Sequence, residues 1–294
     1  MEKIKIKVPA TSANLGSGFD CVGIAFKLYN VFEFEKTESG LSFEGCAQKY
    51  ANENNLAYKA YRAVCEKIGE SSNVKIKFCD TGVPVSRGLG SSATLICAGA
   101  YAANALFGKK LNYSEILEIC TEIEGHPDNV APALLGSLCA SVSDCGEIKS
   151  VKFPVSKNLF FTALIPDFEV STSEARAVLP KEIQRTDAIY NMSRVALLPY
   201  AFSSGYPDLI KAVTKDKIHE QYRKKLFKNV SDVEKICYGC GALTFNISGA
   251  GSTCLCISLE DISAELSQEL AGIENEWRVV PLEVSENGVE EIRE

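Results

Sequence analysis

The chain has 294 residues, of which 46% are apolar and 23% charged, and its formal net charge is −7. This length predicts two domains of roughly 150 residues each, with the balance of an ordinary globular protein. The negative charge argues against a general affinity for nucleic acid or an anionic membrane, and no apolar run reaches the roughly 18 residues that a transmembrane helix needs. We therefore expect neither a nucleic-acid partner nor a membrane partner.

The 12 cysteines lie largely inside apolar runs such as 95–98 and 254–256. Free cysteine behaves as a small buried hydrophobe in such places, and nothing resembles a targeting peptide. Cys237 and Cys240 have the CxxC spacing of a zinc or redox site, but no second CxxC and no nearby histidine completes a zinc set. The composition thus predicts a cytoplasmic protein with reduced thiols.

The N-terminal segment begins with a predicted strand at 3–8, where lysine alternates with apolar residues. Pro9 is expected to end this strand. The following segment, 10–20, is predicted to be a loop of small residues that contains Asn14 and Asp20. Such a loop is either a plain turn or a ligand-facing loop.

The stretch 83–93 places a proline, two glycines and two serines directly before a helix expected at 93–105. Gly88 and Gly90 lack a Cβ atom, so the backbone there can adopt left-handed angles and approach a ligand closely. Ser91 or Ser92 is predicted to cap the helix. The stretch therefore predicts either an anion site, for which phosphate is the usual ligand, or a plain helix start.

Two better-known phosphate loops fit this stretch poorly. A Walker A loop needs a lysine after its second glycine, and none is present here. In a dinucleotide fingerprint the third glycine would stand at Ala93, and no acidic residue follows at the distance needed to hold a ribose. A dinucleotide-dependent oxidoreductase is therefore the least favoured function.

The remaining elements follow from periodicity and from turn residues. Helices are expected at 54–68, 112–122, 127–136, 183–202, 218–225, 230–240 and 262–270, with a short helix capped by Thr172. Strands are expected at 31–35, 74–78, 137–142, 148–153, 159–165, 243–247, 255–258 and 277–284. A polar connector at 154–157 predicts domains at 1–155 and 156–294, the second an α+β sandwich.

Three loops of small residues, at 9–16, 84–93 and 248–253, together resemble the three motifs of the GHMP kinase superfamily. Three such loops in this order are far more specific than any one of them alone. The resemblance implies an α+β, two-domain GHMP kinase fold. Its N-terminal, ATP-binding domain would be ribosomal protein S5 domain 2-like, and its C-terminal domain a ferredoxin-like α/β sandwich.

Within the superfamily the chain is most similar to the homoserine kinases. The similar segments are 9–20, 125–133, 170–176 and 219–223. Ser17 and Ser252 stand where proline is common in the first and third motifs. Both lie in predicted turns, so they affect the expected rigidity of these loops more than the chemistry.

The resemblance implies a nucleotide site that wraps the ATP phosphates with backbone N–H groups. The residues that it assigns to ATP are Asn55, Leu56, Pro84, Val85, Ser86, Arg87, Gly88, Leu89, Gly90, Ser91, Ser92, Ala93 and Thr94. Ser92 and Glu118 would bind Mg²⁺, which prefers hard oxygen ligands. From the residues alone, Glu118 could equally lie on a solvated helix face, and Asn55 could simply cap a helix.

The resemblance also implies a site for the acceptor, an α-amino acid with a side-chain hydroxyl. The residues that it assigns to this site are Asn14, Asp20, Asp128, Asn129, Thr172, Arg176, Arg223 and Gly249. Asp20, with Asn14 and Asp128, would bind the ammonium group, and the two arginines would clamp the carboxylate, since guanidinium binds carboxylates bidentately. Taken alone, either arginine could instead form a surface salt bridge.

The implied reaction is phosphoryl transfer from ATP to L-homoserine in threonine biosynthesis, with Ser92, Glu118 and Asn129 as catalytic residues. Asn129 stands where some relatives place a basic aspartate, so no dedicated protein base is expected, although Asp128 is an alternative base. His126 is expected to be structural. The alternative functions are a mevalonate or sugar kinase and a non-catalytic ATP- or metabolite-binding regulator. The resemblance further suggests a homodimer.

Overall fold

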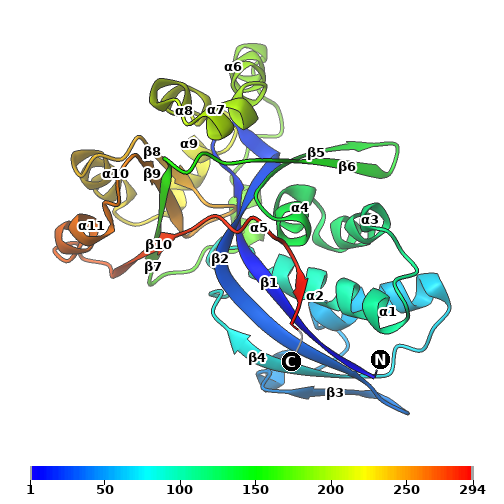
Figure 1. Cartoon of the computed structure of the whole chain (residues 1–294). Helices are drawn as coiled ribbons and strands as arrows, with labels where there is room; N and C mark the ends of the chain where they lie inside the picture. Colours follow the sequence, from blue (N-terminus) through cyan, green and yellow to red (C-terminus); the bar gives the residue numbers. More distant parts are fainter. Residues whose placement is uncertain (1, 293–294) are drawn as a thin grey trace.

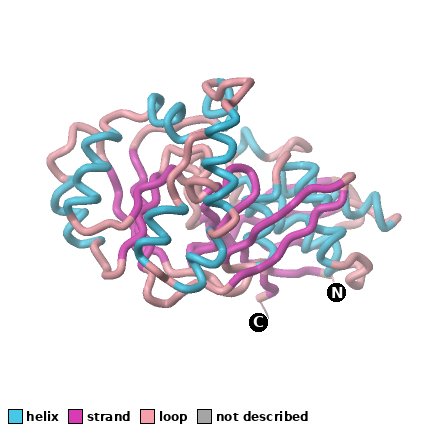
Figure 2. Tube along the Cα trace, turned by 90° about the horizontal axis from the view of Figure 1, so that it is seen from above, coloured by secondary structure: helices cyan, strands magenta, loops and turns pink. Residues whose placement is uncertain are grey.

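A computed structural model of the chain describes residues 2–292, which form two halves, each built around one β-sheet (Figure 1). The seven strands of the first sheet are β1 (Lys3–Asn14), β2 (Gly18–Lys36), β3 (Leu41–Glu44), β4 (Val74–Thr81), β5 (Leu138–Asp144), β6 (Glu147–Phe153) and β11 (Glu290–Glu291). The strands of the second, four-stranded sheet are β7 (Phe160–Pro166), β8 (Thr244–Ile247), β9 (Cys254–Ser258) and β10 (Trp277–Leu282). Seen from above, the two halves lie side by side (Figure 2).

The long antiparallel β1–β2 hairpin lies at the centre of the first sheet. Ile4, Ile6 and Val8 are buried, which confirms the predicted alternation. The predicted end at Pro9 is wrong, because β1 continues to Asn14. The register shifts between Pro9 and Ala10, and such a bulge accommodates a residue that has no N–H to donate.

Four helices cover one face of the first sheet: α1 (Leu56–Ile68), α2 (Ser91–Leu106), α3 (Tyr113–Glu124) and α4 (Pro127–Leu135) (Figure 1). They enclose an apolar core with the buried faces of β1, β2 and β4. Asn55 caps α1 by accepting from the N–H of Ala57 at 3.0 Å, as its residue type predicts. The predicted start of α4 at Pro127 and its stop at Gly136 are confirmed.

The N-terminus of α2 differs from the prediction. The residue that precedes the helix is Gly90, in the left-handed region at φ 69°, and no side chain caps the helix. Ser91 and Ser92 are its first two helical residues. A glycine here leaves the first N–H groups of α2 without a side-chain partner, as an anion site requires.

Seven helices accompany the second sheet: α5 (Thr172–Ala177), α6 (Arg185–Val195), α7 (Leu198–Ser204), α8 (Pro207–Val213), α9 (Glu220–Arg223), α10 (Val230–Gly239) and α11 (Ser263–Leu270). The single helix predicted at 183–202 is wrong. It breaks into α6 and α7, because Pro199 lies at the start of α7, where its missing N–H costs nothing. Ser171, rather than Thr172, caps α5 through a capping box with Glu174.

The predicted boundary at 155/156 falls between β6 and β7, and therefore between the two sheets. The C-terminal segment, however, returns to the first sheet: the N–H of Ser285 donates to Ala25 O at 2.9 Å, and β11 pairs with β1. The division into two domains stays a prediction. No helix in the described part of the chain combines the length and the apolar character that crossing a bilayer requires.

Candidate active site

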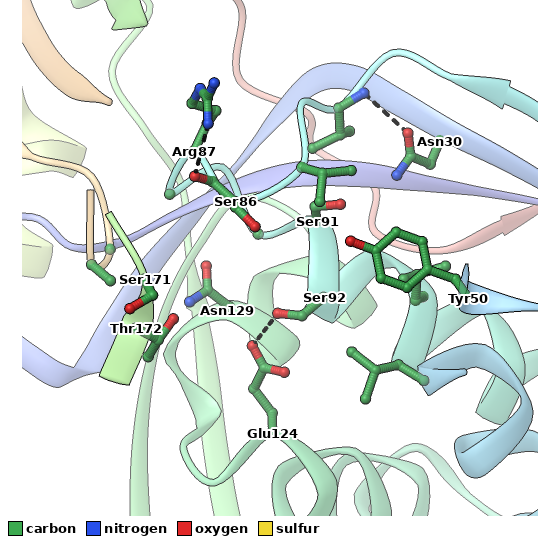
Figure 3. Close-up of a pocket in the computed structure, with 18 of the residues that line it drawn as sticks. Asn30, Tyr50, Ser86, Arg87, Ser91, Ser92, Glu124, Asn129, Ser171 and Thr172 are labelled. Carbon is green, nitrogen blue, oxygen red and sulfur yellow. Dashed lines mark hydrogen bonds between the residues drawn. The ribbon is translucent and has the colours of Figure 1, made fainter. Parts of the chain in front are cut away.

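A cavity of about 980 Å³ opens between the two halves, and residues of both line it. The first half contributes the β1–β2 turn, the segment 45–56, most of the stretch 83–92 and the segment that joins α3 to α4. The second half contributes the starts of α5 and of the loop after β8. In Figure 3, Ser92 and Glu124 face Asn129, while Ser171 and Thr172 approach from the opposite side.

The three loops of small residues meet at this cavity. The N–H of Gly249 donates to Ala13 O at 3.1 Å, which joins the third loop to the first. Ser248 Oγ donates to Gly88 O at 2.5 Å, which joins the third loop to the second. The sequence predicted these loops separately, and the fold brings them into one hydrogen-bonded unit.

The stretch 83–92 requires glycine at two points of close approach. Gly88 and Gly90 have φ of 74° and 69°, in the left-handed region. A Cβ atom on Gly90 would lie 1.9 Å from Thr11 Oγ1, and one on Gly88 would lie 2.3 Å from Ser248 O. The loop therefore packs directly against its neighbours, and α2 points its N-terminus, with its partial positive charge, at the cavity.

Ser92 and Glu124 form the polar pair at the start of α2. Ser92 Oγ donates to Glu124 Oε1 at 2.6 Å (Figure 3). Burial raises the pKa of Glu124, while the hydrogen bond from Ser92 and the proximity of His126 oppose that rise. A half-buried carboxylate beside a hydroxyl is a pair of oxygen donors suited to a hard cation.

Glu118 does not belong to this pair, which corrects the sequence prediction. It lies in the middle of α3 and is absent from the cavity wall, whereas Glu124, the last residue of that helix, lines the cavity. Two residues six positions apart on a helix, at about 100° per residue, face directions about 120° apart. The sequence prediction ended this helix at 122 and therefore missed Glu124. The position of Glu124 directly before the segment 125–133 was the signal that could have identified it.

Most of the residues predicted to bind ATP line the cavity: Asn55, Leu56, Val85, Ser86, Arg87, Gly88, Gly90, Ser91 and Ser92. Pro84 does not line it. Leu89, Ala93 and Thr94 are fully buried beneath the loop and do not line the cavity. Tyr50, which sequence reasoning missed, also lines the cavity, and its carbonyl oxygen accepts from Asn55 Nδ2 at 3.0 Å.

All eight residues predicted for the acceptor line the same cavity. Arg176 donates from its two terminal nitrogens to the two carboxylate oxygens of Asp20, at 2.8 and 3.1 Å. Arg223 is buried, and its Nη1 donates to Gly249 O at 2.9 Å. Asp20 and Arg176, which were predicted to hold opposite ends of an amino acid, thus pair with each other in this structure.

His126 lies in this cluster, although the sequence predicted a structural role for it. Its Nδ1 contacts Asp128 Oδ1, and ligand atoms of Asp20, His126 and Asp128 lie within 4.8 Å of one another. Burial lowers the pKa of His126, but the hydrogen bond to Asp128 and the nearby carboxylates outweigh burial and raise it overall. Because Arg176 engages both oxygens of Asp20, the cluster fits charge pairing better than cation binding.

Thr11 orients the side chain of Asn129, because Thr11 Oγ1 donates to Asn129 Oδ1 at 2.8 Å. This bond commits the amide oxygen and leaves the amide N–H₂ group free to donate. One amide hydrogen faces Asp128 Oδ1, at 3.4 Å between the heavy atoms. Asn129 therefore presents hydrogen-bond donors to the cavity and no basic atom.

The chain is similar to known proteins of one kinase family. Residues 55–137 match the family model described as the GHMP kinases N terminal domain. A homoserine kinase from Clostridium botulinum is 45% identical over 289 residues, which cover 97% of each chain. The crystal structure of a homoserine kinase from Cytophaga hutchinsonii has a TM-score of 0.90 at 29% identity, over 99% of this chain and 98% of that one.

The mevalonate kinase of Methanococcus jannaschii has a TM-score of 0.70 at 14% identity, over 96% of this chain and 98% of that one, and this likeness shows the shared fold alone. These comparisons confirm the GHMP kinase fold and its mixed α and β architecture. The 45% sequence identity over almost the whole chain also shows which family of GHMP kinases the chain belongs to. The chain belongs to the homoserine kinase family of the GHMP kinases.

Proposed function

We propose that the protein transfers the γ-phosphoryl group of ATP to the side-chain hydroxyl of L-homoserine, which gives O-phospho-L-homoserine for threonine biosynthesis. The observation that carries the proposal is a single cavity in which an uncapped helix N-terminus lies near opposed charges suited to an amino acid. The first feature suits phosphate, and the second suits a zwitterion. Membership of the homoserine kinase family supports the same conclusion.

The Asp20–Arg176 pair explains why the acceptor would be an α-amino acid. A ligand with only one charge would separate this pair and leave one partner without a counter-ion. A zwitterion offers an ammonium group to Asp20 and a carboxylate to Arg176, so it replaces one ion pair by two. Arg223, buried with carbonyl oxygens as partners, would supply the second guanidinium for the carboxylate.

Ser92 and Glu124 would hold Mg²⁺, in place of the predicted pair of Ser92 and Glu118. Their oxygens lie 2.6 Å apart on the cavity wall, at the start of α2. The donor set fits, since Mg²⁺ takes one or two protein oxygens together with phosphate oxygens and water. When bound, the ion supplies neutralisation of the charge on the phosphates.

For the transfer itself we propose positioning and charge stabilisation without a dedicated protein base. Asn129 would orient the hydroxyl or the transferring group through its amide hydrogens, because its oxygen already accepts from Thr11. The N-terminus of α2 would stabilise the phosphates. The γ-phosphate oxygens would then accept the proton of the hydroxyl.

Asp128 is the alternative base, and its replacement separates the two mechanisms. In Asp128→Asn we expect weaker homoserine binding but measurable turnover, with the rate followed against pH. Complete loss of turnover with intact homoserine binding would show that Asp128 is the base. His126→Asn is a useful companion variant, because it removes the partner of Asp128 while the carboxylate stays in place.

A substrate panel tests the proposed function as a whole. ADP release is measured with homoserine, mevalonate and galactose, and we expect turnover with homoserine alone. Turnover with mevalonate or galactose would assign the chain to another kinase of the superfamily. Absence of phosphoryl transfer in a single-turnover experiment with bound ATP would indicate a binding regulator instead.

We also propose that the enzyme works in the cytoplasm as a homodimer, without nucleic-acid or membrane partners. The net charge of −7 and the 12 free thiols support the compartment and the absence of nucleic-acid and membrane partners, and the resemblance to the homoserine kinases supports the dimer. Sedimentation equilibrium tests the oligomeric state, and a monomer across the micromolar range would remove the dimer from the proposal.

A further inference from the structure

Arg223 lies on α9 with its guanidinium at the cavity wall, and its side chain is almost completely buried. Its Nε donates to Ala175 O at 3.2 Å, and its Nη1 donates to Gly249 O at 2.9 Å. A buried guanidinium held by carbonyl oxygens keeps its full positive charge for a ligand. Its exact direction matters, because bidentate recognition of a carboxylate is planar.

His219, one helical turn before Arg223, is fully buried and absent from the cavity wall. Its Nε2 lies 3.0 Å from Gly16 O, and its Nδ1 lies 3.4 Å from Arg223 Nη1. A carbonyl oxygen can only accept, so Nε2 carries the hydrogen. A guanidinium nitrogen can only donate, so Nδ1 carries the lone pair.

The two contacts therefore select one neutral tautomer of His219. Burial lowers the pKa of His219, and Arg223 adds to this effect, against the opposing charge of Asp216. Asp216 is itself engaged, because its carboxylate accepts from the N–H groups of His219 and Glu220 at 2.7 and 2.8 Å. The imidazole is thus fixed between the first loop and the guanidinium.

Phe19 closes the third side of this arrangement. Its ring stacks on the ring of His219, with centroids 5.0 Å apart and planes inclined by 24°. Arg223 Cζ lies 5.2 Å from the centroid of the same ring. Phe19 precedes Asp20, so the packing also ties the arginine to the segment that carries the opposite charge of the acceptor site.

From this geometry we propose that His219 is a positioning residue, which acts as a neutral Nε2–H imidazole and holds Arg223 in the direction needed for the carboxylate of the amino-acid acceptor. The proposal rests on the proposed function, since it names what orients one of its binding groups. His219 does not line the cavity, so it would touch neither substrate. Its effect should appear in the affinity for the acceptor and not in the affinity for ATP.

The kinetic test compares His219→Phe with His219→Asn. The phenylalanine keeps a ring against Phe19 but loses both hydrogen bonds, whereas the asparagine can keep an acceptor near the Nδ1 position. For His219→Phe we expect the KM for homoserine to rise about tenfold or more, as for loss of a hydrogen bond to a charged group, with the KM for ATP unchanged. His219→Asn should recover part of this loss.

Two further variants distinguish a role of His219 in positioning Arg223 from a role in the stability of the fold. In Arg223→Lys the guanidinium is gone, so adding His219→Phe should not raise the KM for homoserine further. Thr214→Val is the matched control, because it removes a buried hydrogen bond in the same region, from Thr214 Oγ1 to Ile210 O at 2.8 Å, without touching Arg223. It should lower the unfolding temperature and leave the KM values unchanged.

Nitrogen NMR of the imidazole rings gives a readout that does not depend on turnover. The chain has two histidines, so a His126→Asn sample assigns the remaining signal to His219. We expect a neutral ring with its hydrogen on Nε2. A hydrogen on Nδ1, an unchanged KM for homoserine in His219→Phe, or an equal rise in the Arg223→Lys background would each overturn the proposal. Failure of the wild-type enzyme to phosphorylate homoserine would instead overturn the proposed function, and with it this role.

Discussion

The two ends of the cavity differ in the groups that line them: backbone at one end and charged side chains at the other. The end proposed for the nucleotide is shaped mainly by backbone, namely the turn through Gly88 and Gly90 and the uncapped start of α2, and Ser92 and Glu124 are among the polar side chains there. The end proposed for the acceptor consists of charged side chains from both halves of the chain, such as Asp20 from β2 and Arg176 from α5. One end is thus specified by conformation and the other by charge.

This difference determines how each end can fail. A site made of backbone tolerates changes of side chain but not a change that moves the chain, so its glycines are its sensitive positions. A site made of paired charges keeps its shape after one partner is replaced but loses its complementarity, because the remaining partner has no counter-ion. Substitutions at the two ends should therefore have different effects.

The largest effect is expected from Gly90→Ala, at the nucleotide end. The new Cβ atom would lie 1.9 Å from Thr11 Oγ1, at a residue with φ of 69°. The loop must then move, and a displacement of about 1 Å in a positioned site costs about 100-fold in rate. Steady-state kinetics should show a loss of this size in kcat/KM for ATP.

Gly108→Ala is the control for Gly90→Ala. Gly108 also has a left-handed φ, 90°, but no atom lies within 4 Å of its added Cβ. It should cost about 1 kcal/mol of stability through backbone strain and leave activity unchanged. Equal losses of activity in the two variants would contradict the view that close approach at the cavity, and not strain alone, makes glycine necessary.

Glu124→Gln tests the one carboxylate at the nucleotide end, with Glu118→Gln as its matched control on the same helix. If Glu124 is a ligand of Mg²⁺, its loss should lower kcat about 10- to 100-fold and raise the Mg²⁺ concentration needed for half-maximal rate. Glu118→Gln should stay within about twofold, because Glu118 lies off the cavity wall. A larger effect from Glu118→Gln would restore the original sequence prediction.

Arg176→Lys should have a more selective effect, at the acceptor end. Lysine keeps the positive charge but cannot form the two parallel hydrogen bonds that Arg176 makes to Asp20. We expect the KM for homoserine to rise about tenfold and the KM for ATP to stay unchanged. Arg185→Lys, at an exposed position on α6, is the control. A matching rise in the KM for ATP would mean that the two ends are not separate.

The same contrast explains what the sequence could predict. The signal in residues 83–93 is local, because the glycines and the helix that follows them are neighbours in the sequence, so this stretch alone predicted either an anion site or a plain helix start. Turn and cap residues such as Asn55 and Gly136 likewise act on their immediate neighbours, and their predicted roles are confirmed.

The acceptor end depends on contacts between distant parts of the chain. Asp20 and Arg176 are 156 positions apart, and His219 meets Gly16 across 203 positions. No local pattern predicts such pairings, so the resemblance to a family supplied the residues and the structure supplied their partners. The errors had local causes: Pro9 sits at a bulge, Pro199 breaks a helix, and α3 runs two residues past its predicted end, to Glu124.

The smallest effect on activity is expected at a glutamate of the second half that does not line the cavity. Glu220, on α9 between His219 and Arg223, accepts from Asn246 Nδ2 at 3.0 Å and from the N–H of Ile247 at 2.9 Å. Burial raises its pKa from 4.5 to about 7, against the opposing effect of Lys224. The folded protein therefore binds this proton more tightly than the unfolded chain, and the contribution of Glu220 to stability falls as pH rises from about 4.5 to about 7.

Glu220→Gln removes this titration. At pH 8 the variant should be more stable than the wild type, by up to about 3 kcal/mol, and near pH 4 the difference should vanish. Urea unfolding across this range measures the difference, with Glu182→Gln, at an exposed position, as control. A variant that is less stable than the wild type at pH 8 would show that the charged form of Glu220 supports the fold. An unchanged KM for homoserine would place Glu220 outside the binding charges, because at the acceptor end only the charges that face the cavity should set affinity.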